Sequence, residues 1–142
     1  LGTIEKSNIY VHGRIDDVIN IRGHRIGSEE LESTILQIKE VHECSAVLVE
    51  DELEGATIKL FIVSKEKLDK KIEQKIYSNF GSFAIPRKIY YISELPKTRS
   101  GKILRRLLRN LIYFPKNDNH GDTSTMLNPH VITEIKNKLL NE

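Results

Sequence analysis

The chain has 142 residues, of which 39% are apolar, and this is enough to form the core of a single domain. Its 22 basic and 20 acidic side chains are interspersed and leave a net charge of +2, which excludes a polybasic tail and a disordered acidic segment. The apolar runs are a few residues long and no secretion-signal pattern precedes them, so we expect no membrane partner and a cytoplasmic location.

Two short strands and a helix are predicted at the start of the chain. The ranges 9–12 and 18–22 have strand composition, and a turn with one glycine and two aspartates separates them. Ser28 is then a suitable helix N-cap, because two glutamates follow it in the first turn, where the helix dipole favours acids. We expect this helix to reach Glu40, since apolar residues recur at helical spacing. These residues are Leu31, Ile35 and Ile38.

A hairpin, a second helix and a further strand are predicted next. β-Branched and apolar residues fill 45–50 and 56–63, and the acidic turn between them favours a hairpin. Apolar residues at every fourth position predict a helix over 68–80, and Gly81 is placed to end it. The range 88–93 has the composition of a strand. The alternation of strands and helices predicts an α+β fold, with a small mixed or antiparallel sheet flanked by helices.

A polar loop over 96–102 leads into a third predicted helix, over 103–112. One face of that helix is apolar and the other is basic. Lys102 falls in its first turn, where a cation opposes the helix dipole, so a bound phosphate or carboxylate would explain its position. The alternative is an ordinary solvated helix face. The basic residues are Lys102, Arg105, Arg106 and Arg109.

The end of the chain is predicted to be an extended connector followed by a short helix. Residues 113–128 are rich in Pro, Asn, Asp, Gly, Ser and Thr, and apolar residues recur at helical spacing from Val131 to Leu139. We therefore assign 1–112 to one domain, and 113–142 to the connector and the last helix.

The usual signatures of self-contained catalysis are absent from the sequence. The five histidines and the single cysteine do not have the spacing of metal ligands, so we expect no metal site in this chain. No glycine-rich loop has the pattern of a nucleotide cradle, and Ser100 has no neighbouring base that would make it a nucleophile. Cys44 lies in an apolar run and is predicted to be a buried structural thiol.

Longer motifs occupy three parts of the chain. They are GRIDDVIN at 13–20 with GHRIGSEELE at 23–32, LPKTRSGKILRR at 95–106, and GDTSTMLNP at 121–129. The first two parts resemble, in order and spacing, the C-terminal domain of the adenylate-forming acyl-CoA synthetases. The third is similar to the end of the AMP-forming acetyl-CoA and propionyl-CoA synthetases. The resemblance implies the fold of the C-terminal lid domain of adenylate-forming enzymes, and the short-chain acyl-CoA synthetases fit best.

The family that these motifs resemble joins a carboxylate to ATP, releases pyrophosphate, and passes the acyl group from acyl-AMP to the thiol of CoA. ATP and CoA are therefore the implied substrates, and Mg²⁺ is expected with ATP. The small C-terminal domain rotates between the two half-reactions. The ATP-phosphate loop and the acyl pocket of the family lie in a large N-terminal adenylation domain, which is the implied partner and is not part of these 142 residues. We expect no turnover by the chain alone.

The resemblance also implies roles for single residues. Lys102 would be the adenylation lysine, and Asp16 the hinge residue. Arg14 would contact the nucleotide, and Gly23 would let the pantetheine arm of CoA pass close to the backbone. The residues beside that CoA channel would be Arg22, His24 and Arg25.

Two further expectations follow from the resemblance. Tyr77 stands where acetyl-CoA synthetases tend to have an arginine for the CoA phosphates, which would change how CoA is held. A lysine acetyltransferase and a deacetylase are expected partners of Lys102, because acetylation would remove the charge of its amine.

Two other functions compete with this prediction. One is a ligase lid that loads an acyl group onto the pantetheine of a carrier protein instead of onto CoA. The other is a stand-alone module that binds anions or nucleic acid through the basic helix face. Aromatic residues are not interleaved with the basic ones and a net charge of +2 gives weak steering, so we expect no nucleic-acid partner.

Overall fold

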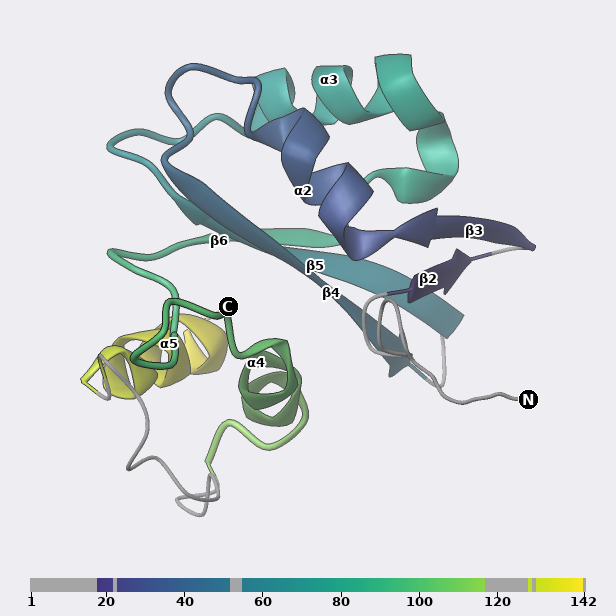
Figure 1. Ribbon diagram of the computed structural model, residues 1–142. Coiled ribbons are helices and arrows are strands. Elements are labelled where there is room, and N and C mark those ends of the chain that lie inside the picture. The colour runs from purple at the N-terminus through teal and green to yellow at the C-terminus, as the bar shows by residue number, and fades with distance from the viewer. Residues whose placement is uncertain (1–17, 22, 52–54, 117–127, 129, 142) are drawn as a thin grey trace.

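The computed structural model describes residues 18–21, 23–51, 55–116, 128 and 130–141. These residues form three layers, which Figure 1 shows: two helices, a three-stranded sheet, and two further helices. A separate two-stranded hairpin packs with the first helical layer. The predicted α+β class, with a small mixed sheet flanked by helices, is confirmed.

The central sheet has the order β4-β5-β6, so β4 is an edge strand among the strands that the structure describes. β4 (Glu43–Asp51) and β5 (Gly55–Val63) are antiparallel and form the predicted hairpin, with Ala46 opposite Leu60. β6 (Lys88–Tyr91) runs parallel to β5, and a helix connects the two, as parallel neighbours require. The sheet is therefore mixed.

Helices cover both faces of this sheet. Successive side chains of a strand point to opposite sides, so one strand contributes to the core on each face. In β5, Leu60 and Ile62 pack beneath the first helical layer, and Phe61 packs against the second. The core therefore consists of two apolar clusters, and each cluster packs one helical layer against one face of the sheet. The helices are α2 (Ser28–Ile35) and α3 (Asp69–Phe80) in the first layer, and α4 (Arg105–Tyr113) and α5 (Val131–Leu140) in the second.

The small hairpin consists of β2 (Val18–Ile21) and β3 (His24–Gly27). Its strands are antiparallel, with Val18 opposite Gly27, and it leads directly into α2. The strand predicted over 9–12 lies outside the described residues.

α2 is shorter than predicted, because it ends at Ile35 and not near Glu40. Beyond it the chain continues in tighter turns: the Ile38 amide donates to the Ile35 carbonyl at 3.0 Å, and the Val41 amide to the Ile38 carbonyl at 3.1 Å. These turns still bury Ile38 in the core, which explains why the apolar spacing continues past the end of the helix.

Ser28 does not cap α2, so that prediction is wrong. The N-cap is Gly27, which has an extended backbone, and Ser28 is the first helical residue. The Ser28 side chain is fully buried, and its Oγ has no hydrogen-bond partner among the residues that the structure describes. Glu29 and Glu30 still place negative charge in the first turn, where the helix dipole favours it.

α4 begins at Arg105 and not at residue 103 as predicted. Ile103 instead pairs with Lys97 in an antiparallel bridge, so the chain is extended shortly before the helix. By contrast, α3 ends as predicted at Gly81, which is its C-cap. Gly81 has a φ of +104°, a backbone angle that residues with a Cβ atom rarely adopt. A short 3₁₀ turn, η2 (Ser82–Ala84), follows.

The last helix starts at Val131, as its apolar spacing predicts. It packs with α4 in one apolar cluster on the second face of the sheet. The domain boundary that we placed at residue 112 stays a prediction.

Candidate functional site

The segment from Pro96 to Leu104, termed the lysine loop, is a short hairpin that carries Lys102. Lys97 and Ile103 face each other at its base. The Leu104 amide donates to the Pro96 carbonyl at 3.0 Å and closes the base. The loop is therefore anchored on both of its strands between β6 and α4.

Thr98 holds the backbone of Lys102 from both sides. Its Oγ1 accepts the Lys102 amide at 3.1 Å, and its own amide donates to the Lys102 carbonyl at 2.9 Å. Gly101, with a φ of +94°, completes the turn by donating its amide to the Thr98 carbonyl at 2.9 Å. Lys102 itself is exposed. The loop thus presents a cation on a fixed backbone. The sequence analysis did not identify Thr98, because its only signal was a hydroxyl group four residues before the lysine.

Lys102 does not lie in the first turn of a helix, so the predicted conflict with the helix dipole is wrong. It precedes Arg105, the first residue of α4, and belongs to the hairpin. The amides of Gly101 and Lys102 are already bound to Thr98. The anion site expected from a cation beside free helix amides is therefore not formed, and Lys102 offers its ammonium alone.

Arg105 is turned toward the sheet and not toward solvent. It forms a salt bridge with Glu32 of α2, and the two side chains are 14% and 8% exposed. Glu32 Oε2 also accepts the Ala46 amide, on the free edge of β4, at 2.7 Å. Because an edge strand leaves alternate backbone groups without a strand partner, the ion pair satisfies one of these groups.

Two more side chains of α4 satisfy the same edge of β4. Arg109 Nε donates to the Leu48 carbonyl at 3.1 Å, and Tyr113 Oη accepts the Glu50 amide at 2.7 Å. Arg105, Arg109 and Tyr113 follow each other at helical spacing and lie on one side of α4. At Arg105 and Arg109 the predicted basic face is therefore neither solvated nor an anion-binding surface. This removes the main support for a stand-alone nucleic-acid-binding module.

Gly23 occupies the turn of the β2–β3 hairpin, with a φ of +83°. An ideal Cβ at this position would meet no atom within 4 Å, so the backbone angle, and not crowding inside this domain, requires glycine. His24 and Arg25 follow in β3, and all three residues are exposed. The structure therefore brings together Gly23, His24 and Arg25 on one exposed hairpin. The predicted site residues Arg14, Asp16 and Arg22 lie outside the described residues.

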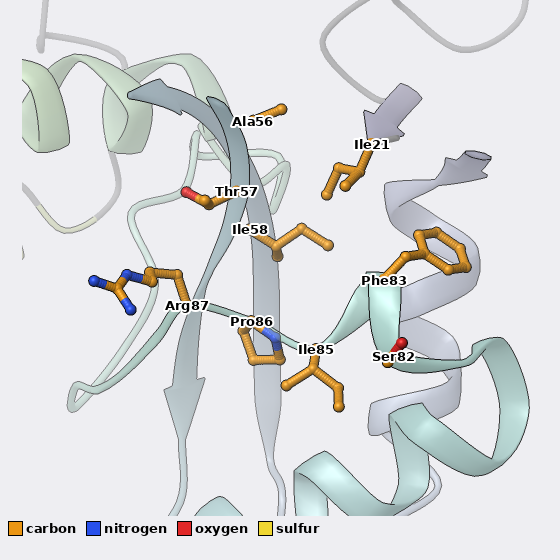
Figure 2. Close-up of a pocket in the computed structure, with 9 residues that line it drawn as sticks. All are labelled: Ile21, Ala56, Thr57, Ile58, Ser82, Phe83, Ile85, Pro86 and Arg87. Carbon is orange, nitrogen blue, oxygen red and sulfur yellow. The ribbon is translucent and has the colours of Figure 1, made fainter. Parts of the chain in front are cut away.

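A pocket of about 370 Å³ lies beside this hairpin (Figure 2). The His24 ring stacks on Phe83, one of the residues that line the pocket, with ring centroids 4.2 Å apart and 16° between the planes. Figure 2 shows Phe83 and Arg87 on opposite sides of the pocket, with Ile58 and Ile85 between them. The pocket therefore combines apolar walls with one guanidinium. Its lining consists of Ile21, Ala56, Thr57, Ile58, Ser82, Phe83, Ile85, Pro86 and Arg87.

The lysine loop and the Gly23 hairpin lie toward opposite ends of the β4–β5 hairpin. Lys97, at the base of the lysine loop, forms a salt bridge with Glu43, the first residue of β4. The pocket beside Gly23 is lined by Ala56, near the start of β5, at the other end of the paired strands. Each strand has 9 residues, so these ends are roughly 27 Å apart at the usual rise of a strand.

The remaining sequence predictions concern single residues and whole classes of site. Cys44 is a buried free thiol, as predicted. Tyr77 is 61% exposed on α3. Within the described ranges, no three histidine, cysteine, aspartate or glutamate side chains gather in a way that could hold a metal ion. None of the helices in these ranges has the length and apolar content needed to cross a bilayer.

The helix-flanked mixed sheet is the architecture that the sequence predicted, whereas the hairpin that carries Lys102 is a finding of the structure. Residues 30–102 match the family of AMP-binding enzyme C-terminal domains, and the chain belongs to this family. The resemblance stated from the motifs is thereby confirmed.

Similar proteins are named as acetyl-coenzyme A synthetases. The one from Phycomyces blakesleeanus is 39% identical over 137 residues, covering 92% of this chain and 20% of that protein. The one from Penicillium chrysogenum is 37% identical over 131 residues, covering 89% of this chain and 19% of that protein. The chain therefore spans about a fifth of the length of these curated relatives.

Solved structures give the same family. An acyl-CoA synthetase from Brucella canis superposes with a TM-score of 0.62 at 36% identity, over 69% of this chain and 19% of that one. A fatty acyl-CoA synthetase from Mycobacterium tuberculosis superposes with a TM-score of 0.62 at 25% identity, over 68% of this chain and 20% of that one.

Proposed function

We propose that the chain is the mobile C-terminal domain of an AMP-forming acyl-CoA synthetase, with acetate or propionate as the carboxylate. In the complete protein it would act with a large N-terminal adenylation domain on ATP, the carboxylate and CoA, and we expect that protein in the cytoplasm. Family membership and the acetyl-coenzyme A synthetase relatives support this proposal. The observation that carries it is the exposed Lys102 on a loop whose backbone Thr98 fixes.

In the first half-reaction, Lys102 would supply positive charge to the α-phosphate of ATP. Attack by the carboxylate increases negative charge on that phosphate and on the departing pyrophosphate, and a pre-positioned ammonium lowers the free energy of this state. Thr98 fixes the backbone from which the side chain extends, so less reorganisation is needed when the substrate arrives. Mg²⁺ would enter with ATP, and Arg14 would contact the nucleotide.

In the second half-reaction, the Gly23 hairpin would guide the pantetheine arm of CoA. Gly23 lacks a side chain at an exposed turn, so an extended ligand can run against its backbone. The adjacent pocket offers apolar surface through Phe83, and Arg25 and Arg87 supply positive charge toward the CoA phosphates. Arg22 and His24 would complete the channel.

The two half-reactions would use opposite ends of the domain. One reaction centre in the N-terminal domain cannot meet the lysine loop and the Gly23 hairpin at once, since the strand ends beside them are roughly 27 Å apart. The domain would therefore turn between the steps, and we assign the hinge to Asp16.

The exposure of Lys102 also makes it accessible to modification. Acetylation of its amine would remove the charge on which adenylation depends. A lysine acetyltransferase and a deacetylase acting on Lys102 would then switch the first half-reaction off and on.

The test of the proposal is Lys102→Ala in the full-length protein. Loss of the ammonium should slow acyl-AMP formation, measured as pyrophosphate release, by about a hundred-fold to several thousand-fold, which corresponds to ~3–5 kcal/mol. Thioester formation from supplied acyl-AMP should be retained. Arg99→Ala removes another exposed cation of the same loop and is the matched control. Normal adenylation by Lys102→Ala, or equal loss of both half-reactions in a folded protein, would contradict the proposal.

A further inference from the structure

Asn128 lies against the base of the lysine loop, although it is distant from the loop in sequence. The residue is 3% exposed. Its Oδ1 accepts the Lys97 amide at 3.1 Å, and its Nδ2 donates to the Leu95 carbonyl at 2.7 Å and to Glu94 Oε1 at 2.6 Å. An asparagine amide has one oxygen acceptor and two N–H donors. Both polar atoms of the Asn128 side chain are therefore used on the strand that enters the loop.

Asn128 takes the place of a neighbouring strand at this base. Lys97 and Ile103 face each other between two hydrogen bonds of the hairpin, so the Lys97 amide points out of the ladder. Asn128 Oδ1 accepts this outward amide. Without Asn128, the Lys97 amide and the buried Leu95 carbonyl would lose their partner, and the entering strand would have to shift to reach water.

α5 fixes the position of Asn128. The Val131 amide, at the start of α5, donates to the Asn128 carbonyl at 3.1 Å. Val131 is fully buried in the apolar cluster that also contains Leu95. The Asn128 amide lowers the pKa of Glu94 by hydrogen bonding to its carboxylate, which favours the charged acceptor. The contact between Asn128 and the loop is thus stabilised by α5 on the side of Asn128 and by the charged Glu94 on the side of the entering strand.

We propose that Asn128 is a positioning residue for Lys102, acting through the base of the lysine loop. The inference rests on the proposed function, in which the Lys102 ammonium promotes adenylation. Asn128 holds the entering strand against α5, and the leaving strand, which is paired to it, carries Lys102. The family match ends at Lys102, so Asn128 lies outside the matched residues.

The expected effect is on rate and not on folding. A displacement of about 1 Å at a catalytic group can lower a rate by about a hundred-fold. A shift of the loop base would therefore slow adenylation while leaving the Gly23 hairpin, at the other end of the domain, in place.

The test uses Asn128→Ala in the full-length protein. We expect pyrophosphate release to fall by about tenfold or more, and thioester formation from supplied acyl-AMP to be retained. Glu134→Ala is the matched control, because Glu134 also reaches from α5 but bonds to the amide and hydroxyl of Ser93, upstream of the loop. The control should leave both half-reactions unchanged.

Hydrogen exchange gives a readout that does not depend on activity. In Asn128→Ala, the amides of 97–104 should exchange faster than in the unsubstituted protein, and those of β4 should keep their protection. If Asn128→Ala does not fold, Asn128→Leu replaces it in the same comparison, because Leu keeps the branched shape and the number of side-chain heavy atoms without polar atoms.

Normal adenylation, unchanged exchange at 97–104, or equal loss of both half-reactions in a folded Asn128 variant would overturn the inference. If Lys102→Ala adenylates normally, the proposed function fails. The exchange measurement then still decides whether Asn128 holds the loop.

Discussion

Glu32 and Arg105 form an ion pair that joins the two helical layers around the free edge of β4. Glu32 lies on α2 and Arg105 is the first residue of α4, and these helices cover opposite faces of the sheet (Figure 1). Arg105 Nε donates to Glu32 Oε2 at 3.1 Å, and the same oxygen accepts the Ala46 amide at 2.7 Å. Because α2 follows the Gly23 hairpin and α4 follows the lysine loop, the pair connects the two proposed sites through the fold.

Glu32→Gln should destabilise the domain by ~3 kcal/mol, because it leaves the charge of Arg105 nearly buried beside a neutral amide. The free energy of unfolding from a urea titration measures this loss. Glu40→Gln is the control, since it removes an exposed salt bridge to Lys71 and should leave the midpoint unchanged. Equal midpoints for Glu32→Gln and the unsubstituted protein would show that the pair contributes nothing to stability.

The thiol of Cys44 should make stability depend on pH in the alkaline range. Burial, and after it the Glu32 carboxylate, raises the pKa of Cys44 to about 12 from its ordinary value of 9.0. Between these values the unfolded chain has released the proton and the folded chain still holds it, so stability falls as pH rises. Urea titrations at pH 8 and pH 10 should show a larger fall for the unsubstituted protein than for Cys44→Ala. The same fall in both proteins would refute this assignment.

Gly23→Leu should spare acyl-AMP formation and block transfer to CoA, because a side chain at the exposed turn would occupy the path proposed for pantetheine. Gly101→Leu is the strain-matched comparison: Gly101 has a φ of +94° and no atom within 4 Å of an ideal Cβ, in the lysine loop. It imposes a comparable backbone strain of ~1–2 kcal/mol at the other end of the domain and should not block transfer to CoA. The two half-reactions are assayed separately. Loss of both in Gly23→Leu would assign Gly23 to the fold alone.

The isolated 142-residue chain should fold and yet release no pyrophosphate from ATP and acetate. It should fold because each face of the sheet has its own apolar cluster. It should be inactive because the proposed ATP and acyl sites belong to the N-terminal domain. Circular dichroism during urea unfolding and a pyrophosphate assay test the two statements. Pyrophosphate release by the isolated chain would be incompatible with the proposed division of labour.

The sequence predicted elements correctly where a local pattern decides them. Gly81 ends α3, and β4 and β5 pair on either side of the acidic segment, as expected for a hairpin. The start of α4 was misplaced because Ile103 and Leu104 fit the apolar spacing of the helix that follows. What keeps Ile103 extended is its pairing with Lys97 across the loop, a contact that helical spacing does not encode.

Only part of the candidate site could be predicted from the sequence. The motif identified Lys102, and the structure places it exposed at the surface. The sequence also put Arg105 and Arg109 on one face of the third helix, but only the fold reveals that an edge strand lies against that face. Asn128 lies in the third motif, but the motif does not indicate its role, because its partners at Leu95 and Lys97 are set by tertiary contact.

The cover that α4 places over the edge of β4 determines where this domain can be cut. A fragment that ends with the family match at Lys102 would lose Arg105, Arg109 and Tyr113, which serve the backbone groups along that edge. The strand would then present a row of open donors and acceptors to any other copy of itself, and such edges promote self-association. We expect that fragment to aggregate. The residues that match the family model are therefore fewer than the residues needed to cover the edge of the sheet.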